Sequence, residues 1–504
     1  MRRMTLTAAT TVEERQDSWF DTSFHVKLFA LCALCFCAAG CAVGPDYKRP
    51  TVKVPDNYRG AQVSTQQISV ADLPWWEVFR DDNLRSLVQT ALANNYDLRI
   101  AVSRVEQARE LAAQARAQYF PSVNYGVTGS DGKNEFGGAI VPNEGKTQGA
   151  FLAVASVAWE ADVWGRVRRL NETSLAQYLA TEEARRGVML SLVSDTAQAY
   201  FELLGLELQL DIAKRTTDSF TQTLEFFTTR LEGGVASMLE TSRAAAARGT
   251  AAASIPELER QIALKEDQIS VLIGQNPDSI AHKAQLLDQV IPPDVPVGLP
   301  SALLERRPDV LEAEQQMHLA NAQVGVATAA FFPRLGLTTF FGRASSPLSD
   351  LSSGQATIWS VAGNVAGPLY QGGFLKAQKH QAVEFWEQTK LEYQLIALRA
   401  FQDVSDALTS REKYEGIRAA QMQAVDAYRE SVTVALDRYV AGRANYYEVL
   451  EAQQQLFPAE NALAVTELNR RVVIVQLYKA LGGGWNLSDP QWIGPAGQLQ
   501  TPTP

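Results

Sequence analysis

Two long proline-free intervals limit what this chain of 504 residues can fold into. No proline lies between Pro142 and Pro256 or between Pro368 and Pro458, and these intervals contain two stretches of 67 residues, 166–232 and 374–440. A straight helix of that length is on the order of 100 Å long, whereas an ordinary globular helix has about 11–12 residues. The stretches therefore predict two very long helices rather than a row of compact domains.

Apolar residues recur at alternating spacings of three and four near the end of both stretches. They are Phe220, Leu224, Phe227 and Leu231 in the first, and Tyr428, Val432, Ala435 and Tyr439 in the second. This spacing is typical of a coiled-coil seam. The alternative is one face of an ordinary core helix. The recurrence of the set in both stretches favours the seam.

The chain is one sequence pattern written twice. Six residues of the first half have an identical residue 208 positions later: Gly165 and Gly373, Asp195 and Asp403, Arg230 and Arg438, Gly234 and Gly442, Glu240 and Glu448, and Gly274 and Gly482. A constant offset leaves no room for insertions, as expected of long helices without loops. We expect a first repeat over residues 94–276 and a second over 306–484. An N-terminal segment (41–93), a linker (277–305) and a tail (485–504) complete the mature chain.

Both repeats have the same predicted order of elements. A helix (96–119 or 308–331) ends at a Phe-Pro pair, because proline lacks an N–H and disfavours helix before it. Two strands follow around a loop. They are about 122–130 and 148–160 around 131–147, and about 334–342 and 356–367 around 343–355. The long helix, a glycine-containing turn and a return helix (237–274 or 445–481) close each repeat.

The strand segments have alternating apolar residues and about the length of a transmembrane β-strand, which is roughly nine to eleven residues. Four strands cannot close a barrel, and lipid does not tolerate an open sheet edge. Several chains must therefore share one barrel: three would supply twelve strands, and two would supply eight. We expect an α+β membrane protein whose long helices continue that barrel as a hollow tube.

The first 40 residues are predicted to be a lipoprotein signal peptide. Residues 28–40 form an apolar run that suits a signal peptide and is too short to span a bilayer. The small residues 38–40 directly before Cys41 resemble a bacterial lipobox, which implies an N-palmitoyl group and an S-diacylglycerol group on Cys41. Ala42, after that cysteine, implies sorting to the outer membrane. The alternative is a plain secretory signal cleaved near Ala39.

Nothing in the sequence indicates an enzyme. The chain has only four cysteines, and the last of them is Cys41, which excludes internal disulfides and cysteine-ligated metal in the mature body. His282, His318 and His380 lack the spacing of a zinc motif, and there is no GxSxG sequence or phosphate-binding loop. A net charge of −10 argues against a nucleic-acid partner. We predict no catalytic residue, no metal and no cofactor beyond the lipid on Cys41.

Five groups of residues carry a resemblance to a known family. They are residues 41–50 (CAVGPDYKRP), Trp75 and Trp76 with Phe79, Asp82 and Leu84, residues 91–98 (ALANNYDL), Leu303 with 306–309 (RRPD) and 313–314, and residues 439–442 (YVAG) with 449–453 (VLEAQ). The chain resembles the outer membrane factor family, the TolC-like lipoprotein exit ducts of Gram-negative tripartite efflux pumps. The resemblance covers residues 41–485.

The resemblance implies a homotrimer with a twelve-stranded outer-membrane β-barrel and a long periplasmic α-helical barrel. It also implies two protein partners, a periplasmic adaptor (membrane fusion) protein and an inner-membrane RND-type pump. The chain would be lipid-anchored in the outer membrane and extend into the periplasm. The predicted function is that of a passive exit duct for drugs or other toxic small molecules, as in multidrug resistance. Alternatives are a duct for type I protein secretion or metal efflux, or a periplasmic coiled-coil lipoprotein without a pore.

The resemblance also points to candidate site residues. Acidic gate residues of the family lie just after the second tip turn, which carries this role onto Glu448 and Glu451, with Tyr447 at the apolar constriction. Family members often have aspartate at both glutamate positions. Rings of acidic side chains can form a cation-binding constriction. The alternative is that both glutamates are solvated helix residues, and Glu240 is a weaker candidate.

The tip turns, residues 230–237 and 438–445, are predicted to dock the adaptor. The candidates there are Gly233, Gly234, Arg438 and Gly442. Glycine allows the positive φ that a tight helical hairpin needs.

Overall fold

The computed structural model describes residues 42–59, 78–133, 135–136, 139–140, 147–289, 291, 298 and 300–483. The predicted signal peptide (1–40), Cys41, Trp75 and Trp76, and the tail (485–504) lie outside the described residues. The chain divides into two compact units. Unit 1 comprises Met1–Lys48, Arg109–Gln177 and Met317–Thr389, and unit 2 comprises Arg49–Ala108, Tyr178–Gln316 and Lys390–Pro504. Each unit therefore takes residues from both predicted repeats.

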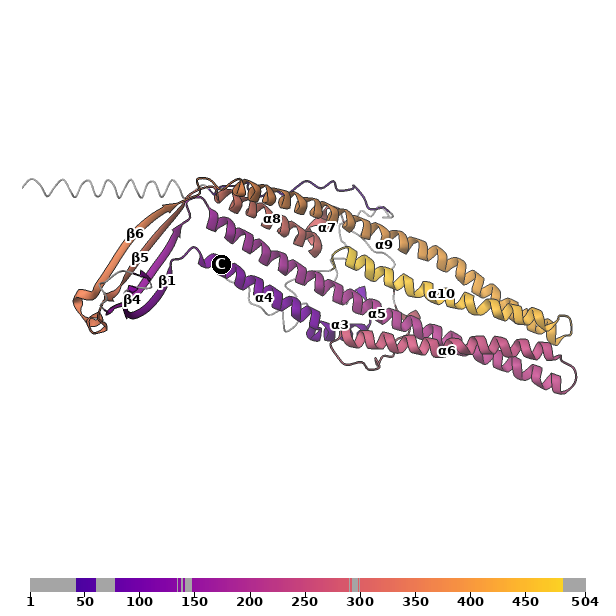
Figure 1. Ribbon diagram of the computed structural model, residues 1–504. Coiled ribbons are helices and arrows are strands. Elements are labelled where there is room, and N and C mark those ends of the chain that lie inside the picture. Colours follow the sequence, from indigo (N-terminus) through magenta and orange to yellow (C-terminus); the bar gives the residue numbers. More distant parts are fainter. Residues whose placement is uncertain are drawn as a thin grey trace, which may run out of the picture. The chain divides into compact units, whose positions relative to one another are not determined.

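The same order of elements occurs twice along the described chain (Figure 1). The helices are α3 (Asp82–Asn94), α4 (Tyr96–Ala117), α5 (Arg166–Glu232), α6 (Met238–Leu272), α7 (Pro300–Arg306), α8 (Pro308–Ala329), α9 (Phe374–Val440) and α10 (Tyr446–Ala480). The strands are β1 (Ser122–Lys133), β2 (Glu135–Phe136), β3 (Ala139–Ile140), β4 (Thr147–Ala161), β5 (Arg334–Ser345) and β6 (Thr357–Ala366). Short 3-10 turns, η2 (Leu286–Asp288), η3 (Leu348–Ser352) and η4 (Gly354–Ala356), lie in the connections.

The predicted lengths of the two long helices are confirmed, whereas the other helices are two to three residues shorter than predicted. Helices α5 and α9 have 67 residues each, with the predicted bounds. The return helices α6 and α10 have 35 residues each, and α4 and α8 have 22 each. Within the part of the chain that the structure describes, no helix combines the length and the apolar character needed to cross a lipid bilayer.

Unit 1 contains a four-stranded antiparallel sheet in the order β1-β4-β5-β6. The four predicted strands are present, but the loop expected over 131–147 is shorter than predicted. Strand β1 runs on to Lys133, and β2 pairs with β3 as a separate two-residue ribbon. The ladder between β1 and β4 reaches Lys133 opposite Thr147, which explains the extension.

The strand register places apolar side chains on one face of this sheet. Tyr125 pairs with Ala155, Ala155 with Phe341, and Phe341 with Trp359, and directly paired residues project from the same face. Tyr125 is 89% exposed and Trp359 is 72% exposed. Val123 lies on this face as well. One face of the sheet thus presents large apolar side chains that the described residues leave exposed.

The segment after Cys41 packs against the helices of unit 1. The Val43 N–H donates to the Trp164 carbonyl at 3.0 Å, and Asp46 pairs with Arg169 at 2.9 Å. Gly44 has φ +106°, and a Cβ there would lie 2.5 Å from the Cα of Gly325. Only glycine permits this approach and this conformation, so residues 43–46 are held against α5 and α8.

Unit 2 is built from helices. Arg307, from the RRPD motif, precedes α8 and donates to Asp309, to Asp403 on α9 at 2.8 Å and to the Ala480 carbonyl at the end of α10. Its side chain is 12% exposed. The hydrogen bonds to these acidic partners keep the pKa of the guanidinium raised despite its burial. The motif therefore joins three helices of unit 2.

Candidate functional site at the tips of the two helical hairpins

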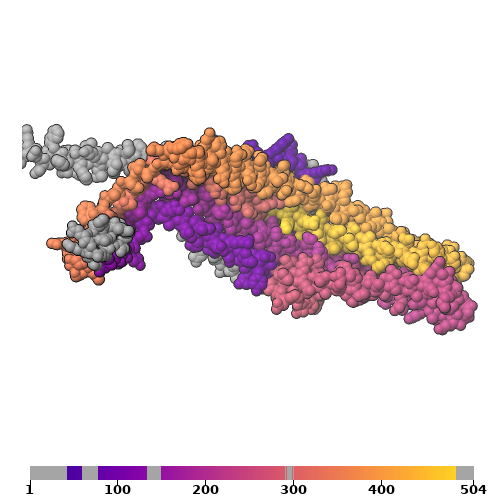
Figure 2. All heavy atoms as spheres, viewed as in Figure 1, coloured from indigo at the N-terminus to yellow at the C-terminus, as the bar shows by residue number. Residues whose placement is uncertain are grey.

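The candidate gate and docking residues lie at the turns between α5 and α6 and between α9 and α10. Both turns lie at the same end of unit 2 (Figure 1), where the ends of α6 and α10 are side by side on the molecular surface (Figure 2). The four helices share an apolar cluster just behind the turns. Its buried members include Phe227 of α5, Ala244 of α6, Ala435 of α9 and Tyr446 of α10. The structure thus brings the two predicted tips together.

Both long helices end in a Schellman motif. In the first turn, the Val235 N–H donates to the Arg230 carbonyl and the Gly234 N–H to the Leu231 carbonyl, both at 2.9 Å. In the second turn, the Arg443 N–H donates to the Arg438 carbonyl at 2.8 Å and the Gly442 N–H to the Tyr439 carbonyl at 2.9 Å. These bonds satisfy carbonyls that a helix end would otherwise leave unpaired.

The requirement for glycine falls on one residue in each turn. Gly234 has φ +76° and Gly442 has φ +68°, and a Cβ on either would meet nothing within 4 Å. The backbone conformation therefore selects glycine, and crowding does not. Gly233 does not have a positive φ, and its N–H donates to the Thr229 carbonyl at 3.1 Å as in a continuing helix. Of the two first-turn glycines, only Gly234 needs to be glycine on conformational grounds.

The return helices begin differently. In α6, the Ser237 side chain accepts from the Glu240 N–H while the Glu240 carboxylate accepts from the Ser237 N–H at 2.8 Å, which forms a capping box. In α10, Asn445 makes no side-chain cap bond. Glu448, which matches Glu240 at the offset of 208, has a carboxylate oxygen 3.6 Å from Arg438 instead. Glu240 therefore has a structural role that Glu448 does not share.

The three predicted gate residues follow the Asn445 cap on the first turns of α10. Tyr447 is 55% exposed, Glu451 is exposed and Glu448 is half-buried. Arg243 of α6 lies over the Tyr447 ring, 5.8 Å from its centroid, which is a cation–π contact between the two hairpins. Two carboxylates and an aromatic ring are thus presented close to the turn.

Sequence reasoning did not identify Arg243 and Tyr446, two residues that join the hairpins. The ring of Tyr446 is 3.9 Å from that of Phe227. The Tyr446 hydroxyl is buried and has no hydrogen-bond partner in the part of the chain that the structure describes, and burial raises the pKa of its phenol. Arg230 adds a third link, because its guanidinium lies 5.6 Å from the Tyr439 ring centroid. The identity of Arg230 with Arg438 at the repeat offset signalled it, whereas no pattern signalled Arg243 or Tyr446.

Comparison with known proteins identifies the family. The model of the outer membrane efflux protein family matches the chain twice, over residues 87–275 and 299–483. The chain belongs to the outer membrane efflux protein family. The probable efflux pump outer membrane protein TtgC of Pseudomonas putida is 33% identical over 465 residues, which cover 91% of this chain and 96% of the relative. The cation efflux system protein CusC of Escherichia coli is 32% identical over 462 residues, which cover 89% and 98%.

Solved structures of the family have the same fold. A crystal structure of CusC matches with a TM-score of 0.80 at 30% identity, covering 88% of this chain and 100% of that one. The MtrE outer membrane channel of Neisseria gonorrhoeae matches with a TM-score of 0.80 at 28% identity, covering 88% and 98%. The predicted family, the outer-membrane location and the function as an efflux channel are confirmed.

Proposed function

We propose that this chain assembles as a homotrimer, in which four strands from each copy form one twelve-stranded outer-membrane β-barrel and the long helices form a periplasmic helical barrel. The observation that carries this proposal is the four-stranded sheet of unit 1. Strands β1 and β6 are its edges, and backbone groups at an open edge are not tolerated in lipid. Copies of the same chain can pair β6 with β1 of the next and close the barrel.

The exposed apolar face of the sheet supports the same assembly. The face that carries Val123, Tyr125, Phe341 and Trp359 would contact lipid, because a monomeric soluble protein rarely leaves such side chains uncovered side by side. The opposite face includes Asn124, Ser156, Ser360 and Asn364, which suits a water-filled lumen. Alternation of this kind is expected of a transmembrane barrel.

The tips would form the periplasmic gate and the adaptor-docking surface. Symmetry would place three copies of Glu448 and of Glu451 around one axis, with Tyr447 beside them. Rings of acidic side chains select cations, and the like charges within each ring repel one another. The turns at Gly234 and Gly442, with Gly233 and Arg438, would contact the periplasmic adaptor protein. An inner-membrane RND-type pump would supply the energy, because no residue of the channel is proposed to be catalytic.

Cys41 would carry the lipid anchor, with N-palmitoyl and S-diacylglycerol groups. Two residues after Cys41, the Val43 N–H donates to the Trp164 carbonyl, which holds this segment close to the end of strand β4 in unit 1. Two acyl signals on one residue suffice for stable membrane attachment. Replacement of Cys41 by serine would test the anchor, because mass spectrometry of the mature protein would then lose the acyl mass.

The exported substrates are proposed to be drugs and other toxic small organic molecules, as the names of relatives such as the antibiotic efflux protein ArpC and the solvent efflux protein SrpC indicate for those proteins. Metal efflux is a second candidate, because CusC, named for cation efflux, is nearly as similar at 32% identity. Deletion of the gene followed by growth on toxic organic compounds and on metal salts separates the two. Sensitivity to metal salts alone would replace the first candidate with the second.

Assembly is tested by the mass of the detergent-extracted protein. We expect a particle of three chains, and a heat-modifiable band on electrophoresis. The Gly442→Leu and Gly234→Leu variants should still reach the outer membrane as trimers but should lose export, since the turn no longer fits the adaptor. A monomeric particle would contradict the shared barrel, and normal export by both variants would contradict the docking role of the turns.

A further inference from the structure

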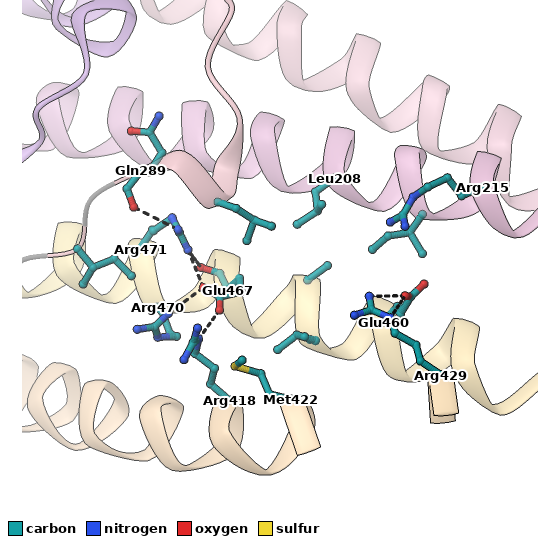
Figure 3. A pocket seen from close by; sticks show the side chains of 15 residues that line it. Leu208, Arg215, Gln289, Arg418, Met422, Arg429, Glu460, Glu467, Arg470 and Arg471 are labelled. Atoms are coloured by element: carbon teal, nitrogen blue, oxygen red, sulfur yellow. Dashed lines mark hydrogen bonds and ion pairs between the residues drawn. The ribbon is translucent and has the colours of Figure 1, made fainter. Parts of the chain in front are cut away.

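A cavity of about 510 Å³ lies within unit 2 (Figure 3), and no residue of the two hairpin turns lines it. It is bounded by α5, α9 and α10 and by the segment around Leu287, Gln289 and Ile291. Its size lies within the range of about 300–1,000 Å³ found for small-molecule sites. Neither the gate nor the proposed docking surface uses its lining residues.

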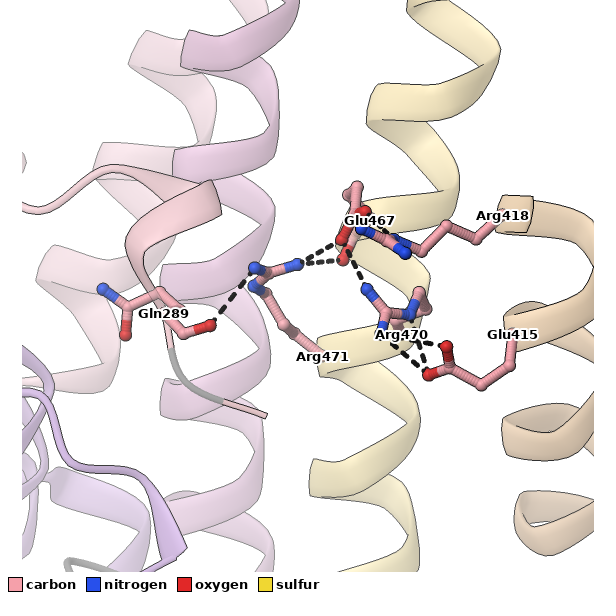
Figure 4. Close-up of polar contacts among 6 residues, drawn as sticks. All are labelled: Gln289, Glu415, Arg418, Glu467, Arg470 and Arg471. Atoms are coloured by element: carbon pink, nitrogen blue, oxygen red, sulfur yellow. Dashed lines mark hydrogen bonds and ion pairs between the residues drawn. The ribbon is translucent and has the colours of Figure 1, made fainter. Parts of the chain in front are cut away.

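Three guanidinium groups converge on one carboxylate at one wall of this cavity (Figure 4). Glu467 of α10 accepts from Arg418 of α9, from Arg470 at 2.8 Å and from Arg471 at 2.9 Å. The side chains of Glu467 and Arg471 are 8% and 5% exposed. Arg470 also binds Glu415 of α9, at 2.8 Å. The group therefore holds three positive charges against two negative ones.

The cluster leaves one buried donor unused. Arg471 donates through its Nη atoms to Glu467 and to the Gln289 carbonyl at 3.2 Å, but its Nε atom is buried and has no partner among the described residues. Burial, together with the nearby charges of Arg470 and Arg418, lowers the pKa of Arg471 although Glu467 acts to raise it. Burial acts to raise the pKa of Glu467, and the hydrogen bonds from Arg418 and Arg471 lower it overall. One further anion would relieve this excess of positive charge.

The other charged residues that are described in the cavity lining are matched. Arg429 binds Glu460 at 2.6 Å, and Arg215 binds Asp211 at 3.0 Å. The unmatched charge therefore belongs to the Glu467 cluster. Beyond it, the wall is apolar and is formed by Leu208 and Ile212 of α5, Met422 of α9 and Leu463 of α10. Guanidinium groups beside an apolar wall suit a ligand with a charged end and an apolar body.

We propose that this cavity binds an amphipathic organic anion, with its carboxylate at Arg418 and Arg471 and its apolar body against Ile212 and Met422. Planar guanidinium groups are the preferred partners of carboxylates, because they offer paired N–H donors in a fixed geometry. The site lies in the wall of unit 2 and does not depend on the gate or on the substrate that the duct carries.

Equilibrium dialysis of the full-length, detergent-solubilised protein against labelled naphthoate tests this site, with a detergent-only cell as the blank. Naphthoate should bind and the neutral isostere naphthamide should not. Arg418→Gln leaves two arginines against two carboxylates and should weaken naphthoate binding about tenfold or more, as expected for loss of a charge-assisted hydrogen bond. Glu415→Gln, at a side chain that is 52% exposed, removes a competing carboxylate and should tighten binding severalfold.

Two further variants separate the site from general effects. Met422→Trp fills the cavity without altering charge and should abolish binding. Arg260→Gln, in an exposed pair with Glu257 on α6, removes the same charge elsewhere and should change nothing. Binding of naphthoate that is equal in all variants, equal binding of naphthamide, or displacement of naphthoate by an equal concentration of inorganic phosphate would overturn the proposal.

Discussion

Replacement of Gly442 by alanine isolates the backbone requirement of the second turn. Gly442 has φ +68°, and its added Cβ would touch nothing within 4 Å, so the cost is conformational and not steric. A left-handed conformation costs an L-residue roughly 1–2 kcal/mol. Exposed turns generally open without global unfolding, so that cost should appear in the opening equilibrium of the bond from the Arg443 N–H to the Arg438 carbonyl.

Amide hydrogen exchange of the native protein measures this opening. A cost of 1–2 kcal/mol corresponds to exchange roughly 5–30-fold faster at Arg443. Gly416→Ala is the matched control, because Gly416 lies inside α9, also has nothing within 4 Å of an added Cβ and does not have a positive φ. Alanine there should stabilise the helix by about 0.5–1 kcal/mol and slow exchange around it. Unchanged exchange at Arg443 in Gly442→Ala would refute the assigned turn conformation.

Two further predictions concern buried polar groups of unit 2. Tyr446→Phe should stabilise the protein by about 1 kcal/mol in urea unfolding, because it removes a buried hydroxyl that has no partner among the described residues. Tyr200→Phe should destabilise the protein by about 1.5–3 kcal/mol, because the Tyr200 hydroxyl donates to Asp81 at 3.0 Å. The reverse order would contradict the two assignments. The hydrogen bond from His282 to Glu207, at 3.1 Å, raises the pKa of the histidine above its usual value even though burial acts to lower it. His282→Gln should therefore destabilise the protein most below about pH 6.5, the unperturbed pKa of histidine. The loss of stability should become smaller as the pH rises through the raised pKa. A loss of stability that grows with pH would contradict this.

The fold could be predicted from the sequence to an unusual extent because the long helices tolerate no insertions. The absence of proline indicated that α5 and α9 are long, and the repeated glycines Gly165, Gly373, Gly234 and Gly442 lie next to their ends. The Phe-Pro pairs indicated the ends of α4 and α8, which the structure places one turn or less earlier. The loop after β1 was less predictable, because the extension of that strand to Lys133 depends on its pairing with Thr147 of β4. Such a pairing is a tertiary contact that local periodicity does not contain.

The candidate site was predictable in position but not in detail. The repeat offset placed the turns at Gly234 and Gly442 correctly, since both residues have a positive φ. The contact of Arg243 with Tyr447 and the buried position of Tyr446 depend on how the two hairpins pack. The local sequence around these residues does not indicate that packing. The repeat also did not indicate that Glu240 forms a capping box with Ser237, whereas Glu448 lies near Arg438.

The central claim, a duct closed at the tips by acidic side chains, is tested most directly by single-channel recording in planar bilayers. The Glu448→Ala, Glu451→Ala double variant should have a higher conductance and a weaker cation preference than the unmodified protein, since the ring charges are removed. The Glu259→Ala, Glu412→Ala double variant removes the same charge from exposed positions on α6 and α9 and should behave like the unmodified protein. Equal conductance and equal cation preference in all three proteins would contradict the gate.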